Sequence, residues 1–170
     1  MRHIISILIE NESGALSRVA GVFSARGYNI ESLTVAATED PSLSRMTLVT
    51  RGSEEIIAQI TKHLNKLIDV VKLIDLAEAF QIERELMMIK IKAIGEMRDE
   101  IRRVVDTFGS KIIDVTPATY IIEMTGPSEK IDTFIATLDP TNIIEMVRSG
   151  PIDISMGEKG ILSQKGRSLP

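Results

Sequence analysis

The chain has 170 residues, of which 44% are hydrophobic and none is cysteine, and its formal net charge is −4. This length suffices for one ordinary domain or two small ones. The lack of cysteine excludes disulfides and thiol catalysis, and the acidic balance argues against a nucleic-acid partner. No apolar run approaches the roughly 20 residues that span a bilayer, and the N-terminus lacks signal-peptide features, so we expect a cytoplasmic protein without membrane contact.

The first half of the chain predicts the order strand, helix, strand, strand, helix, strand. Two segments carry apolar side chains at helical spacing and would each bury one face against a sheet. The first helix would begin at Ser13 or Gly14 and end at Gly27, because glycine tolerates the left-handed conformation at helix C-termini. Ser53 would cap the second helix. The strands are expected at about 3–10, 30–38, 44–51 and 69–76.

The second half repeats this order with little sequence similarity, and Gly109 would end its first helix. We therefore predict an α+β fold of two ferredoxin-like βαββαβ units, each with its helices on one face of a sheet. The expected boundaries are a first domain over 1–76, a linker over 77–84, a second domain over 85–157 and a poorly ordered tail over 158–170.

Each predicted unit is small enough, at about 75 residues, for a single core to give only marginal stability. Two helices would cover one face of each four-stranded sheet and leave the other face open. Small domains with an uncovered sheet face are usually stabilised by association through sheet edges or open faces, so we expect at least a homodimer. On one face of the second strand the small residues Ser32, Thr34 and Ala36 leave room for something else to pack, unless that face is solvated.

Motifs for catalysis are absent from the sequence. It contains no phosphate-binding loop, no dinucleotide fingerprint and no nucleophile elbow. The only histidines, His3 and His63, are far apart in sequence, and the adjacent acids at 54–55 and 99–100 suit the first turns of helices. We therefore predict no catalytic residue, no metal site and no cofactor in this chain.

The loop Asn11-Glu12-Ser13-Gly14 joins the first strand to the first helix. Helix starts expose unpaired N–H groups and a partial positive charge, which attract a carboxylate. The amide oxygens of Asn11 and Asn29 can accept from an ammonium group, and both loops would lie at one sheet end if the first two strands were neighbours. An amino acid carries both groups, so the pattern favours a sensor over a catalyst. The alternative is an ordinary helix start capped by Asn or Ser.

Longer motifs resemble a known family. Residues 3–19, HIISILIENESGALSRV, resemble the start of an ACT domain. Residues 26–35, RGYNIESLTV, together with 44–47 and 111–117, resemble the regulatory (small) subunits of acetolactate synthase, and the resemblance covers nearly the whole chain. It implies a non-catalytic subunit that activates a separate catalytic subunit and confers feedback inhibition by valine in branched-chain amino acid biosynthesis. Thiamin diphosphate, Mg and FAD would belong to that catalytic partner only.

The resemblance also implies a valine site. In ACT domains the effector usually lies between two domains, near the loop from the first strand to the first helix. Here the backbone of that loop would meet the carboxylate, and Asn29 would approach from the partner domain. The expected effector-binding residues are Asn11, Ser13, Gly14, Ala15, Leu16, Asn29 and Ile30.

Two other functions stay open at this stage. One is a free-standing ACT regulator of transcription or of another enzyme, although no helix-turn-helix or catalytic domain is attached. The other is a small enzyme on a ferredoxin-like scaffold, which the missing catalytic groups disfavour. Fold alone excludes neither. The residues also do not choose among valine, leucine and isoleucine, because one methylene is worth only about 1–3 kcal/mol in an apolar pocket.

Overall fold

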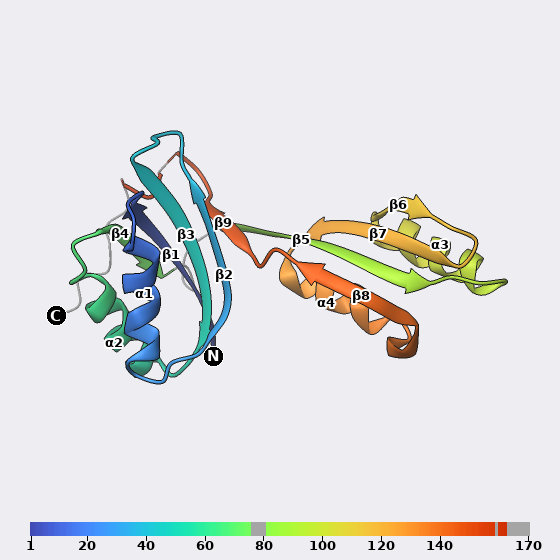
Figure 1. Cartoon of the computed structure of the whole chain (residues 1–170), viewed down its shortest axis with the longest axis horizontal. Helices are drawn as coiled ribbons and strands as arrows, with labels where there is room; N and C mark the ends of the chain where they lie inside the picture. Colours follow the sequence, from blue (N-terminus) through green and yellow to red (C-terminus); the bar gives the residue numbers. More distant parts are fainter. Residues whose placement is uncertain (76–80, 159, 163–170) are drawn as a thin grey trace. The chain divides into compact units, whose positions relative to one another are not determined.

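The computed structural model describes residues 1–75, 81–158 and 160–162. The chain forms two compact units, one from residues 1–82 with those from 152 onward, and one from residues 83–151. Each unit follows the βαββαβ order, so the predicted α+β fold is confirmed (Figure 1). None of the described helices is long and apolar enough to cross a membrane.

The first unit is a four-stranded antiparallel sheet with two helices on one side (Figure 1). Its elements are β1 (Arg2–Glu10), α1 (Ala15–Ser24), β2 (Ile30–Ala37), β3 (Leu43–Arg51), α2 (Glu54–Leu64) and β4 (Val70–Asp75). The sheet order is β2-β3-β1-β4. Alternate β1 residues Ile5, Ile7 and Ile9 are buried in the core with apolar residues of both helices, which follows from the period of two in a strand.

Local sequence chemistry explains where the helices of this unit begin and end. The Ser53 hydroxyl caps α2 by accepting from the N–H of Ile56 at 3.4 Å, as predicted. Gly27 has a φ of 66°, and the N–H of Tyr28 donates to the carbonyl of Phe23 at 3.0 Å, which closes the C-terminus of α1.

The second unit repeats the architecture, and its elements are β5 (Gln81–Lys92), α3 (Met97–Phe108), β6 (Lys111–Val115), β7 (Thr119–Gly126), α4 (Ser128–Ala136), η1 (Pro140–Asn142) and β8 (Ile143–Arg148). The sheet order is β6-β7-β5-β8. Gly109, with a φ of 66°, ends α3 as expected. The face opposite the helices keeps exposed apolar side chains, among them Met88 and its cross-strand neighbour Val147.

The division of the chain differs from the expected boundaries in two places. Residue 76, the end of the expected first domain, and residues 77–80 of the expected linker lie outside the described residues, and residues 81–84 form the beginning of β5. Residues 152–155, expected in the second domain, form a ninth strand, β9 (Ile152–Ser155), that clusters with the first unit. The chain therefore passes from one unit to the other twice.

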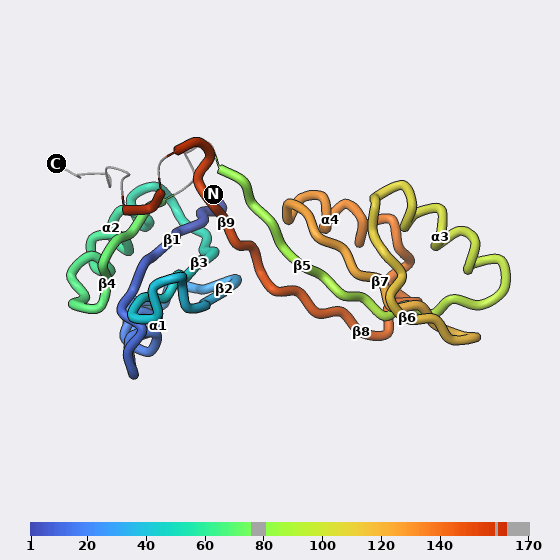
Figure 2. Tube along the Cα trace, turned by 90° about the horizontal axis from the view of Figure 1, so that it is seen from above, coloured from blue at the N-terminus to red at the C-terminus, as the bar shows by residue number. Residues whose placement is uncertain are grey.

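Strand β9 reaches the face of the first sheet that lies opposite the helices (Figures 1 and 2), where Asp153 contacts Thr47 of β3. The side chain of Asp153 is 0% exposed, and its Oδ1 accepts from the hydroxyl of Thr47 at 3.0 Å. Nη2 of Arg45 lies 3.6 Å from Oδ2 of the same carboxylate. The face of the first sheet opposite the helices is therefore partly covered by the returning chain, at Arg45 and Thr47 of β3.

Candidate functional site

The loop between β1 and α1 is held in shape by backbone geometry and by a neighbouring turn. Gly14 is the N-cap of α1 and has a φ of 88°, a left-handed conformation that favours glycine. No side chain of the described residues caps this helix, so the alternative of an Asn- or Ser-capped start is wrong. The first N–H groups of α1 therefore face the loop, except that of Ala15, which donates to the carbonyl of Glu12 at 3.3 Å.

Asn11 is fixed by the turn between β2 and β3. Its backbone N–H donates to the carbonyl of Ser42 at 2.7 Å, and its side-chain Nδ2 donates to the carbonyl of Pro41 at 2.9 Å. These contacts orient the side-chain amide and leave its oxygen as the acceptor group. Asn11, Ser13, Gly14 and Leu16 are all exposed at this loop. A ligand here can therefore meet a fixed amide oxygen and the start of a helix together.

An ion pair that the sequence did not predict lies next to the loop. The guanidinium of Arg18 donates to the carboxylate of Asp69 through Nε at 2.5 Å and Nη2 at 2.6 Å. The Asp69 carbonyl accepts from the N–H of Glu10 at 2.9 Å, so the pair joins α1 to the end of β1 and the start of β4. The hydrogen bond from Arg18 lowers the pKa of Asp69, which keeps the carboxyl group ionised at neutral pH.

Arg18 also restricts the position of Gly14. A Cβ atom added to Gly14 would lie 2.8 Å from Nη1 of Arg18, which is closer than van der Waals contact allows. Glycine is therefore favoured here by its backbone conformation, and a side chain would in addition have to displace the end of the Arg18 side chain. The spacing of four residues between Gly14 and Arg18, one helical turn, is the signal in the sequence that points to this contact.

Asn29 and the Asn11 loop lie at opposite ends of the sheet, so the expectation that both loops share one sheet end within a chain is wrong. Strand β3 lies between β1 and β2, so these two strands are not neighbours, and they run parallel to each other. Thr50 of β3 pairs with His3 of β1 on one side and with Ile30 of β2 on the other, so Asn29 lies near the beginning of β1. The effector loop follows Glu10, at the other end of β1. Seven residues of strand separate the two levels, a distance of about 23 Å. Asn29 and Asn11 of one chain cannot contact the same small ligand.

The described residues hold no group of three or more His, Cys, Asp or Glu side chains placed to bind a metal ion. The nearest arrangement is buried His3, whose Nδ1 lies 3.3 Å from Oδ2 of Asp75 and whose Nε2 lies 3.8 Å from Oε1 of Glu54.

Comparisons with known proteins cover both units. A family model described as the AHAS small subunit-like ACT domain matches residues 5–72, and a model described as the small subunit of acetolactate synthase matches residues 84–157. The acetolactate synthase small subunit of Haemophilus influenzae is 53% identical over 163 residues, covering 95% of this chain and 100% of the relative. The isozyme 3 small subunit of Escherichia coli is 52% identical over 160 residues, covering 94% and 98%.

A solved structure agrees with these matches. The crystal structure of the acetolactate synthase small subunit from Thermotoga maritima superposes with a TM-score of 0.83 at 36% sequence identity, covering 94% of this chain and 99% of that chain. Sequence and structure thus match the same kind of protein along both units. The chain belongs to the acetolactate synthase small-subunit family, as a regulatory and not a catalytic subunit, and its first unit is an ACT domain.

Proposed function

We propose that this chain binds and activates the catalytic large subunit of acetolactate synthase and makes the complex sensitive to inhibition by valine. Thiamin diphosphate, Mg²⁺ and FAD stay with the catalytic partner in this proposal. The observation that carries it is the loop from Asn11 to Gly14, where a fixed amide oxygen lies beside the uncapped start of α1. This is the pair of groups that the main chain of a free amino acid requires.

The carboxylate of valine would accept hydrogen bonds from the N–H groups at the start of α1, where the helix dipole also favours negative charge. The ammonium group would donate to the side-chain oxygen of Asn11. The guanidinium of Arg18 lies against Gly14 and adds positive charge near the proposed position of the carboxylate, although Asp69 balances that charge. Leu16 is 43% exposed at the loop and offers apolar surface to the effector's side chain.

Asn29 joins this site only from a second copy, and sheet geometry gives a way for it to do so. Strand β2 is an edge strand, and its end at Ala37 is level with the end of β1 at Ile9, across Ser44. If two copies pair their β2 edges antiparallel, the beginning of one β2 meets the end of the other. Asn29 of the second copy then arrives at the sheet end that carries the Asn11 loop. We therefore propose a homodimer with effector sites at its interface.

Reconstitution with the catalytic subunit tests this function. We expect no acetolactate formation from pyruvate by the isolated chain, a higher rate when the chain is added to the catalytic subunit, and a lower rate when valine is then supplied. A parallel titration with the catalytic subunit alone is the control, because it should show neither activation nor valine inhibition. Pyruvate turnover by the isolated chain, or an unchanged rate on mixing, would contradict the proposal.

A further inference from the structure

Strand β9 is attached to the first sheet by polar contacts. The carboxylate of Asp153 is 0% exposed and accepts from the hydroxyl of Thr47 at 3.0 Å. Nη2 of Arg45 lies 3.6 Å from Oδ2 of this carboxylate and donates to the Asp153 carbonyl at 3.4 Å. The two isoleucines of β9, Ile152 and Ile154, are exposed. The attachment of β9 therefore depends on where two side chains of β3 lie.

A buried carboxylate makes this attachment sensitive to small changes. Removing a carboxylate from water is costly, and only well-placed partners offset that cost. Arg45 and Thr47 are alternate residues on one face of β3, so a loosening of this strand displaces both partners together. Strand β9 can therefore be attached or released, and the balance between these two states follows the order of β3 at these residues.

The same strand begins at the turn that holds the effector loop. The carbonyls of Pro41 and Ser42 accept from the side-chain and backbone N–H groups of Asn11, at 2.9 Å and 2.7 Å. Strand β3 starts at the next residue, and Arg45 lies about 10 Å along the chain from Ser42. The segment that orients Asn11 is thus continuous with the segment that holds β9.

Ordering of this shared segment couples its two ends. In the proposed function, on which this inference rests, the ammonium group of valine donates to the side-chain oxygen of Asn11 and so restricts the turn behind it. The attachment of β9 needs the beginning of β3 to be ordered as well. Two binding events that need one ordered segment favour each other, because the entropy of ordering is lost only once.

We propose that β9 is an effector-sensitive strap, in which valine at the loop and Asp153 on β3 each strengthen the binding of the other. Thermodynamic linkage makes the two effects equal, so the attached strap raises the affinity for valine by the factor by which valine stabilises the attachment. Only residues 149–151 separate β9 from β8 of the second unit. The strap is therefore a covalent route from the effector loop to the second unit.

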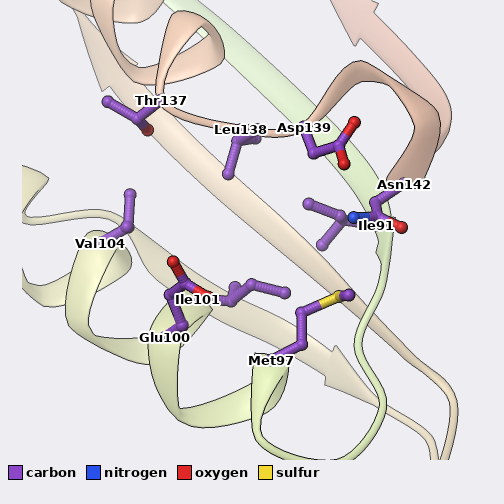
Figure 3. Close-up of a pocket in the computed structure, with 9 residues that line it drawn as sticks. All are labelled: Ile91, Met97, Glu100, Ile101, Val104, Thr137, Leu138, Asp139 and Asn142. Carbon is purple, nitrogen blue, oxygen red and sulfur yellow. The ribbon is translucent and has the colours of Figure 1, made fainter.

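Amide hydrogen exchange of residues 153–155 in the full chain, with and without saturating L-valine, tests the proposal. We expect valine to slow this exchange by about 5- to 150-fold, the usual range for coupled sites. The amides of Ile91 and Ile101 are the reference, because these buried residues line a cavity within the second unit (Figure 3) and take no part in the attachment. Their exchange should not change.

Calorimetric titration with valine measures the same coupling from the other side. Asp153→Ala removes the buried carboxylate and should weaken valine binding, by no more than the factor by which valine slows exchange in the native chain. Ile154→Ala is the matched control, because this residue belongs to the same strand and is 64% exposed, and it should leave the affinity for valine unchanged.

The outcomes separate this inference from the function on which it rests. Failure of the native chain to bind valine would overturn both. Valine binding with unchanged exchange at residues 153–155, or a folded Asp153→Ala variant with native affinity for valine, would overturn the strap alone. The exchange measurement uses the native chain, so it decides the matter even if the variant does not fold.

Discussion

Replacing Gly14 by alanine tests the physical account of the effector loop. Gly14 has a φ of 88°, and an added Cβ would lie 2.8 Å from Nη1 of Arg18. Two costs therefore add in one substitution, backbone strain and displacement of the guanidinium. Gly27 at the other end of α1 provides the matched control. Its φ is 66°, but a Cβ there would meet nothing within 4 Å, so Gly27→Ala has only the backbone cost.

The magnitudes follow from these contacts. A residue with a Cβ in the left-handed region costs about 1–2 kcal/mol relative to glycine. An added methyl group that forces a neighbour to shift costs about a further 1 kcal/mol, at the low end for overpacking because the neighbour is the end of a long side chain. We therefore expect Gly14→Ala to lower the free energy of unfolding by about 2–3 kcal/mol and Gly27→Ala by about 1–2 kcal/mol.

Urea unfolding of the full chain measures the difference, with the methyl signals of Ile5 and Ile7 reporting on the first unit. In an Arg18→Ala background the two glycine substitutions should cost the same, because the clash is gone. Equal destabilisation by Gly14→Ala and Gly27→Ala in the native background would refute the reasoning about Arg18. The same strain means that Gly14→Asp should disturb the fold as well as valine binding.

Three further predictions follow from other contacts. Asn29→Ala should weaken valine binding ten- to hundredfold, from the loss of a hydrogen bond to a charged group worth about 1.5–3 kcal/mol, and unchanged calorimetric binding would remove Asn29 from the site. Asp153→Ala should lower the opening free energy of β9 by about 1–3 kcal/mol in amide hydrogen exchange, because the buried carboxylate accepts from Thr47, and unaltered exchange would contradict this. Arg148→Ala should destabilise the second unit by about 3 kcal/mol in urea unfolding, because it leaves Glu85 buried without its cation. Burial alone would raise the pKa of Glu85, but hydrogen bonds from Arg148 and Ser128 outweigh it and lower that pKa. The Glu85–Arg148 pair therefore contributes its full stability above the pKa of glutamate in the unfolded chain. This contribution is lost as the pH falls through the lower pKa of Glu85 in the folded chain, and Arg148→Ala should not show that loss.

The sequence was sufficient for features that neighbouring residues determine. Ser53 caps α2, and Gly27 and Gly109 end α1 and α3, because capping and left-handed turns depend on a few adjacent groups. The order of strands and helices followed from apolar periodicity in the same way. The loop at Asn11 was also recognisable, since a strand followed by Ser-Gly and an apolar helical stripe marks a helix start.

Features that depend on pairing between distant segments were not predictable from local patterns. The position of β3 between β1 and β2, which separates Asn29 from the loop, is set by long-range hydrogen bonds. The ion pair of Arg18 with Asp69 spans 51 residues, and the contact of Thr47 with Asp153 spans 106. A short strand such as β9 has too few residues for a clear period, so its return to the first unit required the structure.

Amide hydrogen exchange at residues 14–17 with and without L-valine tests the central claim most directly, because this stretch includes the N–H groups of Leu16 and Ser17 that are proposed to bind the carboxylate. The account predicts that saturating valine slows exchange at the start of α1 in the full chain, while the amides at the start of α3 are unaffected. Unchanged exchange at residues 14–17, in a preparation whose complex with the catalytic subunit is still inhibited by valine, would contradict it.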